Sequence, residues 1–320
     1  MPTATVNQRP RTSFLLRNWQ HLSAPAKVLA AVGLIMAVSA VFHTVVFLQS
    51  GTAWEGPVSW RKPITFGLSL ALTAITLALI ESCLRLRPLT SWLLLGILSA
   101  AFVVEAALVT MQAWRGVPSH FNTATPFDAM VFSAMGMTVM VIVVVIVSLA
   151  ILSFTSAKPG APDLTLSVRA GMVLLVAGQV LGAAIIGVGE PAVLSGNEAA
   201  VFGPEGVVLG AAGILKSPHG IALHAIQVLP LLGWLVQRSS WSDVRRRHAV
   251  WSAGIGYSLV LAVSVFQAYT GQAQFALSIG TLAAALAGVL LVAKPYAEAG
   301  VQVLRERKDV AAGQRPRPRS

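Results

Sequence analysis

The most prominent pattern along this chain is a succession of long apolar stretches separated by short polar segments. A helix of about 20 mostly apolar residues crosses the roughly 30 Å of hydrocarbon in a bilayer. Each stretch of that length should be helical, because lipid offers no partner to an unpaired backbone group. The eight predicted spans are 28–48, 63–84, 90–112, 129–153, 168–189, 218–237, 249–270 and 274–293.

The composition agrees with a membrane protein and excludes an ordinary soluble domain. Hydrophobic residues make up 55% of the 320 and charged residues only 11%, whereas about 25% of a soluble domain is charged. We therefore expect an all-α, polytopic transmembrane helical bundle. One domain at 28–293 would follow a basic arm at 1–27 and precede a basic, disordered tail at 294–320. A signal peptide cleaved near 38–40 is an alternative for the first stretch, but its full spanning length favours a span.

Positive charge is distributed unevenly between the two sides of the predicted bundle. With the N-terminus inside, 19 of the 23 Lys and Arg residues fall on the inner side, and the outer side holds Arg61, Lys62, Arg115 and Lys216. Because Lys and Arg are retained on the cytoplasmic side, the pattern predicts a bacterial plasma (inner) membrane protein with both termini cytoplasmic. The net charge of +11 is then explained without a nucleic-acid partner.

Three ionisable side chains within the spans share one depth on the outer side. His43, Glu105 and His224 each lie roughly 8–10 Å below the outer end of a span, at 1.5 Å per residue. An ionisable group in a span rarely faces lipid, so all three should point into the bundle. Helical spacing places Gln112 above Glu105, and Gln227 beside His224. The sequence therefore predicts a polar pocket that opens outward.

The outer loops at 49–62 and 113–128 add polar side chains to this pocket. Proline opens the spans that follow these loops, and the positive end of a helix dipole favours an anion at such starts. The predicted binding residues are Arg61, Lys62, Gln112, Arg115, Asn122, Asp128 and Gln227, and the predicted acid–base residues are Glu105, His120 and His224.

Two short motifs lie in these loops: W-x-K-P at 60–63 and R-x-x-x-S-H-F-N at 115–122. Together with the histidines of 217–231, they resemble an uncharacterised family of bacterial multi-span membrane proteins. The resemblance covers 59–128 and 217–231, implies a membrane fold and transfers no activity. Haem A synthases also combine eight spans with several histidines. Their histidine pairs on alternate helices and their paired outer cysteines are not found in this sequence.

One hypothesis for the function is a binding or catalytic site on the outer side. His43, His219 and His224 can ligate Zn or another transition metal, or two histidines can ligate haem iron. No HExxH, CxxC or HxxxH spacing supports either cofactor. Without a metal, the cations and helix starts would bind an anionic amphiphile such as a lipid headgroup, while Glu105 or a histidine moves a proton.

Two other classes of function stay open at this point. A transporter or channel would need a polar path across the inner half of the membrane, where Glu81 and Gln179 are the main candidates and form no continuous track. A structural or assembly role would use the outer polar groups as a hydrogen-bond network between helices. Enzymatic activity and oligomeric state are likewise open, and membrane lipids are the only partner that the pattern requires.

Overall fold

A computed structural model describes residues 20–203 and 205–311, and this part of the chain is almost entirely helical. Eight of its helices are long and apolar enough to cross a membrane, which confirms the predicted all-α bundle. The spanning elements are α2 (Ala24–Ser50), α3 (Arg61–Glu81), α4 (Pro88–Ser91) continued by the π-helical turn η1 (Trp92–Gly96) and α5 (Ile97–Trp114), α6 (Pro126–Thr155), α7 (Pro162–Leu194), α9 (Lys216–Val236), α10 (Asp243–Tyr269) and α11 (Ile279–Ala311).

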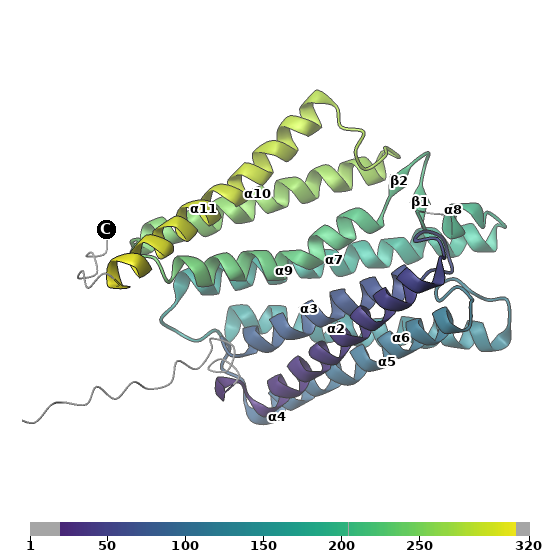
Figure 1. Cartoon of the computed structure of the whole chain (residues 1–320), viewed down its shortest axis with the longest axis horizontal. Helices are drawn as coiled ribbons and strands as arrows, with labels where there is room; N and C mark the ends of the chain where they lie inside the picture. The colour runs from purple at the N-terminus through teal and green to yellow at the C-terminus, as the bar shows by residue number, and fades with distance from the viewer. Residues whose placement is uncertain (1–19, 204, 312–320) are drawn as a thin grey trace, which may run out of the picture.

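Successive spans alternate in direction, so the beginning of α2 and the end of α11 lie at the same end of the bundle (Figure 1). We call this the termini end. The opposite end carries the loops 51–60, 115–125, 195–215 and 270–278. The third of these loops contains α8 (Ala199–Phe202) and a short hairpin of β1 (Val208–Leu209) and β2 (Gly213–Ile214). We call it the hairpin end, and it is the side that the sequence predicts to face outward.

The helices extend beyond the predicted apolar stretches, most clearly at α11. Residues 294–311 continue this helix, so the prediction that the tail is disordered from 294 is wrong for them. Packing explains the extension, because Ala299 is fully buried and the Tyr296 hydroxyl donates to the Val228 carbonyl of α9. Residues 312–320, and residues 1–19 of the predicted basic arm, lie outside the described part.

Five of the helices, α3, α5, α6, α7 and α9, form a closed ring in which each packs on the next and α9 packs back on α3. Helix α2 covers one side of this ring, and α10 and α11 cover another (Figure 1). The half of the ring toward the termini end is filled by a single apolar cluster. Its large members include Leu77, Phe102, Ile146, Met172 and Ile226. Gln112, Ser119 and Asp128 are buried near the hairpin end, and Glu81, Ser91 and Asp163 are buried toward the termini end.

Helices α7 and α9 approach each other closely because glycines line their contact. A Cβ atom at Gly171 would lie 3.2 Å from Ile226 Cα, and one at Gly178 would lie 3.1 Å from a Leu223 methyl. At Gly182 the added atom would lie 2.9 Å from the His219 ring. Small residues allow two helices in a membrane to gain dispersion contacts along their backbones.

The α7–α9 contact should therefore be sensitive to side-chain volume. We expect Gly178→Leu to lower the free energy of unfolding by about 1–3 kcal/mol, the usual cost of overpacking a tight interior. Gly187→Leu is the matched control, because no atom lies within 4 Å of a Cβ placed at that glycine of the same helix. Thermal unfolding in mild detergent measures both. An equal fall in melting temperature for the two variants would contradict close α7–α9 packing.

Candidate functional site

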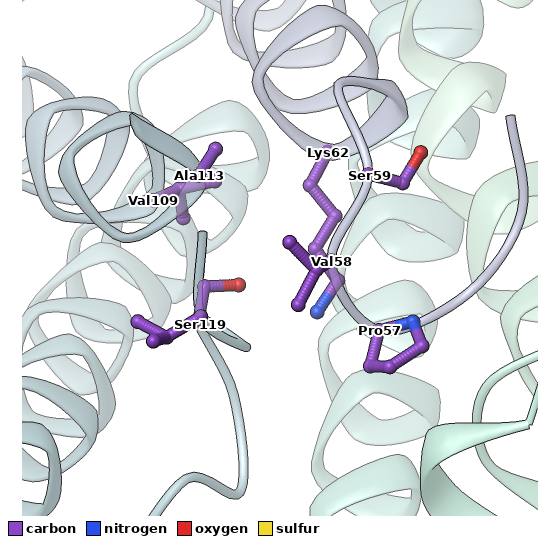
Figure 2. Close-up of a pocket in the computed structure, with 8 residues that line it drawn as sticks. Pro57, Val58, Ser59, Lys62, Val109, Ala113 and Ser119 are labelled. Carbon is purple, nitrogen blue, oxygen red and sulfur yellow. The ribbon is translucent and has the colours of Figure 1, made fainter. Parts of the chain in front are cut away.

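A narrow cleft lies at the hairpin end, between loop 51–60, the start of α3, the end of α5 and loop 115–125 (Figure 2). The cleft is so narrow that essentially none of its volume admits a water-sized sphere. Figure 2 shows the Lys62 side chain extending from α3 into this space. The lining is otherwise mainly apolar and consists of Pro57, Val58, Ser59, Lys62, Val109, Ala113, Val117 and Ser119.

Lys62 is the cation of this cleft that lacks a counter-charge. Its half-buried ammonium makes no ion pair or side-chain hydrogen bond with any residue in the described ranges. Arg61 and Lys216 lie within electrostatic range of it. Glu55 and Glu205 act on Lys216 instead. Positive charge is thus concentrated where α3 and α9 begin, and Lys62 carries the part of it that faces the cleft.

The N–H groups at the start of α3 are already satisfied by Ser59. The Ser59 hydroxyl oxygen accepts from the Arg61 N–H at 3.1 Å, and the Ser59 carbonyl accepts from the Lys62 N–H at 3.2 Å. At the start of α6, the Thr125 hydroxyl oxygen accepts from the Asp128 N–H at 3.1 Å. The free N–H groups expected at these helix starts are therefore used within the protein. An anion in the cleft would depend on the lysine side chain and on the helix dipole.

His120 lies beside Lys62 in an aromatic environment. Its Nδ1 is 2.9 Å from the Ser119 hydroxyl, and its ring centroid is 5.5 Å from Phe66 and 6.3 Å from Phe132. Burial, together with the positive charge of Lys62, lowers the pKa of His120 to about 3. The imidazole is therefore neutral at physiological pH and adds no positive charge to the cleft.

The loop that carries His120 is held in a strained conformation. Phe121 has φ of 60°, in the left-handed region that few residues other than glycine adopt. Its ring packs with Val201 and Val207 at the hairpin end and lies against Gly189, where a Cβ would come within 2.6 Å of the ring. Strain of this kind persists only where packing holds it. Docking of Phe121 thus fixes the loop that places Ser119 and His120.

Arg115 belongs to a separate buried network that neutralises its charge. Its Nη1 donates to Asp128 Oδ1 at 2.5 Å and also to the Gln112 side-chain oxygen. The Gln112 amide donates to the same Asp128 oxygen at 3.0 Å, and the Thr125 hydroxyl donates to the other at 2.6 Å. Gln112 and Asp128 are almost fully buried. This network joins α5 to α6, and it leaves Arg115 less suited than Lys62 to an external anion.

Asn122, also predicted as a binding residue, uses its side chain within its own loop. Its Nδ2 donates to the Pro118 carbonyl at 3.2 Å, and its Oδ1 accepts from the Ala124 N–H at 3.1 Å. Both bonds are local, as expected of an Asn that stabilises a turn. This geometry gives Asn122 a part in shaping the loop.

His43 has both ring nitrogens engaged. Nδ1 lies 2.7 Å from the Ser39 carbonyl, and Nε2 lies 3.1 Å from the Trp114 indole nitrogen. A carbonyl only accepts and an indole N–H only donates, so His43 is the neutral tautomer with its proton on Nδ1. Its ring also stacks on Trp60 at 5.9 Å. His43 therefore joins α2 to α5 and has no lone pair free for a metal ion.

The other two predicted metal ligands lie on α9 with different partners. His219 Nδ1 donates to the Gly178 carbonyl at 2.7 Å, and His224 Nδ1 lies 3.3 Å from Gln227 Oε1. Within the described residues, no group of three or more His, Cys, Asp or Glu side chains is placed to hold a metal ion. The structure thus does not bring His43, His219 and His224 together as a metal site. Haem ligation by two histidines stays a prediction.

Among the described carboxyl groups, Glu105 has both oxygens buried without a partner, whereas the buried Asp163 of α7 has one such oxygen. Glu105 itself is 1% exposed. The Nε2 atom of Gln227 on α9 is likewise buried without a partner. Buried polar groups are nearly always hydrogen-bonded. Glu105 and Gln227 are therefore functional candidates.

Comparisons of the chain with protein-family models, with curated proteins and with solved structures give no match. The function therefore has to be inferred from the geometry of the site. Sequence reasoning counted Lys216 among the outer cations but did not include it in the site, although its position beside a proline-marked helix start was a usable signal. Ser119 belongs to the motif at 115–122 but was not counted among the predicted site residues, and nothing in the sequence identified the apolar lining of the cleft.

The His43 bridge gives a first test of this arrangement. We expect Trp114→Phe to lower the free energy of unfolding by about 1 kcal/mol, because it leaves the buried His43 Nε2 without a donor. Trp54→Phe is the matched control, since Trp54 packs on Phe47 at the same end and makes no side-chain hydrogen bond that involves His43. Thermal unfolding in detergent measures both. Equal stability of the two variants would show that the indole bond contributes nothing.

The neutral state of His120 predicts a specific dependence on acid. Between pH 6.5, the ordinary value for histidine, and about 3, the unfolded chain binds a proton at this residue and the folded chain does not. Stability should therefore fall as pH is lowered through this window, and His120→Gln should reduce the fall. The measurement is melting temperature from pH 7 to pH 4.5, with the exposed His21→Gln as control. Parallel curves for wild type and His120→Gln would contradict the assignment.

Proposed function

We propose that this multi-pass membrane protein binds an anionic amphiphile at its hairpin end, with the phosphate or carboxylate headgroup on Lys62. The single observation that carries the proposal is the ammonium group of Lys62, which extends into the cleft without a counter-charge. A half-buried cation of this kind is stabilised by an anion that replaces its lost hydration. Arg61 and Lys216 add to the attraction.

The cleft suits a headgroup better than a whole lipid. Essentially none of its space admits a water-sized sphere, so a headgroup would meet the Lys62 ammonium group at the mouth of the cleft. The acyl part of an amphiphile would therefore stay in the membrane, outside the cleft. A free anion of similar size shares the headgroup chemistry and is the alternative source of the ligand.

We infer that the hairpin end faces outward from a bacterial plasma membrane. The support is the distribution of Lys and Arg, of which 4 lie on the predicted outer side and 19 on the inner side. Both termini would then be cytoplasmic, and the headgroup would come from the outer leaflet or from the external solution.

A purely structural role fits some of these residues and not others. His43 and the Arg115 network have satisfied hydrogen bonds that join helices. Lys62 and Glu105 contribute no such bond. A conduction path fits less well, because the apolar cluster fills the half of the ring toward the termini end.

Ligand binding by purified protein in a non-ionic detergent tests the proposal. We expect short-chain phosphatidylglycerol to bind more tightly than short-chain phosphatidylcholine, and Lys62→Gln to weaken that binding about tenfold, the value of one charge-assisted hydrogen bond. Lys158→Gln is the matched control, because Lys158 lies at the termini end and donates to the Ser82 carbonyl. Microscale thermophoresis gives the affinities.

Inorganic phosphate, titrated in the same way, distinguishes the two sources of the headgroup. Competition between phosphate and the anionic lipid would show that the cleft recognises the headgroup alone. Equal affinity for the two lipids, or unchanged binding by Lys62→Gln, would overturn the proposal.

A further inference from the structure

The described part of the bundle contains two deeply buried glutamates, and their surroundings differ. Glu81, on α3 at the termini end, accepts a hydrogen bond from the Ser91 hydroxyl at 2.6 Å. Glu105, on α5, is more buried, and both of its carboxyl oxygens lack a partner. The protein therefore satisfies one of the two acids and leaves the other open to a species that the polypeptide does not supply.

Apolar side chains surround the face of α5 that carries Glu105. Phe102 lies one turn below it and belongs to the apolar cluster of the ring. Val109 lies one turn above it and packs with Val131 and Met135 of α6. Helix α5 also contacts α2, α3 and η1. The helical wall around Glu105 is thus formed by several elements, so the carboxyl is shielded from lipid.

The charged groups on these neighbouring elements are engaged elsewhere or lie outside reach of an ion pair. His43 bonds to Ser39 and Trp114, and Asp128 bonds to Arg115 and Gln112. No ion pair in the described ranges includes Glu105. The ionisable groups on the packed elements are Lys27 and His43 of α2, Arg61, Lys62 and Glu81 of α3, and Asp128 of α6, with none on η1.

The groups around Glu105 determine which species can bind to its carboxyl group. An ionised carboxylate without a partner is very unfavourable in an apolar interior. A metal cation would need several further ligands, and no group of three acidic, His or Cys side chains stands there within the described residues. A proton needs only the carboxyl itself. We propose that Glu105 is a proton-binding site inside the bundle, loaded and unloaded from the hairpin end.

The side chains on either side of Glu105 along the bundle determine from which end a proton can reach it. Toward the hairpin end, Val109 is the side chain one turn above Glu105, and the same residue lines the Lys62 cleft. One turn of helix is about 5.4 Å, so a single layer of side chains separates the carboxyl from the cleft. Toward the termini end, Leu95, Leu98 and Phe102 are all buried in the apolar cluster. A proton therefore reaches Glu105 from one side only.

The proton site is independent of the anion site, although the two share Val109. An anion on Lys62 would lie in the cleft that Val109 lines, and Val109 is one helical turn from the carboxyl that holds the proton. The pair of sites would then bind both parts of a weak acid, namely its anion and its proton. This link rests on the proposed function, whereas the proton site does not.

Two measurements on the full-length protein test the site. Dicyclohexylcarbodiimide adds to a protonated carboxyl in an apolar environment: the carboxyl proton moves to a carbodiimide nitrogen and the carboxylate oxygen bonds to the carbodiimide carbon, which yields a stable N-acylurea after rearrangement. We expect peptide mass spectrometry to find the adduct at Glu105, with less at higher pH and little at Glu81. Infrared spectra should show a protonated carboxyl band that is lost in Glu105→Gln.

Hydrogen exchange separates a loaded site from an inert buried acid. The infrared band should shift in deuterated buffer, and Val109→Phe should slow that shift. Val103→Phe should not slow it, because Val103 is 49% exposed on the outer face of α5. A band that does not shift, or no adduct and no band at neutral pH, would overturn the proposal. None of these results depends on Lys62, so a failed anion site and a failed proton site are distinguishable. If Glu105→Gln does not fold, the adduct and exchange in wild type still decide the outcome.

Discussion

The structure depends on the requirement that a polar group removed from water must find a partner. Along the backbone this requirement produces the eight spanning helices. Between helices it selects the contacts that are made: glycines bring α7 close enough to α9 for His219 to donate to the Gly178 carbonyl. The tyrosines of α10 and α11 follow the same rule, since Tyr257 donates to the Ile221 carbonyl of α9 at 2.6 Å and Tyr296 to that of Val228. Helix α9 thus receives polar contacts from both sides.

The same requirement divides the polar residues of the hairpin end into two groups. His43 and the Arg115–Asp128 pair are fully engaged, and each joins one helix to another. Lys62 and Glu105 are left with charges or oxygens that no described residue satisfies. Satisfied groups are sufficiently explained by stability. Unsatisfied buried groups lower the stability of the fold, and they are found mainly where a ligand or a proton binds to them.

The sequence was sufficient to predict features that depend only on position along the chain. Hydropathy located all eight spans, and a constant rise per residue placed Glu105 and His224 at similar depth. The sequence was not sufficient to predict which side chains on different helices are in contact. His43 bonds to Trp114 of α5 while His224 lies 3.3 Å from Gln227 of its own helix, so shared depth did not make these two histidines partners. The end of α11 was mispredicted for a related reason: residues 294–311 are polar in sequence, but Ala299 and Tyr296 pack against other helices. Helix rotation and partner choice are tertiary properties that a single sequence does not encode locally.

The asymmetry of the ring restricts what any ligand can do. Lys62, Glu105 and His120 lie in the half near the hairpin end, whereas the opposite half holds Glu81 but is mainly filled by side chains such as Leu98, Ile146 and Met172. For a solute to cross, this packed cluster would have to open, and interiors packed at crystal-like density resist small continuous deformation. A ligand that enters at Lys62 therefore leaves by the same side unless two helices of the ring separate.

The glycine-lined α7–α9 contact is the least suitable place for the ring to open, because its backbones are in direct contact. The α3–α9 contact closes the ring beside Lys62 and Lys216, and it is the boundary at which a bound anion would screen the repulsion between these two cations. If an anion binds there as proposed, occupancy of the cleft favours the closed ring.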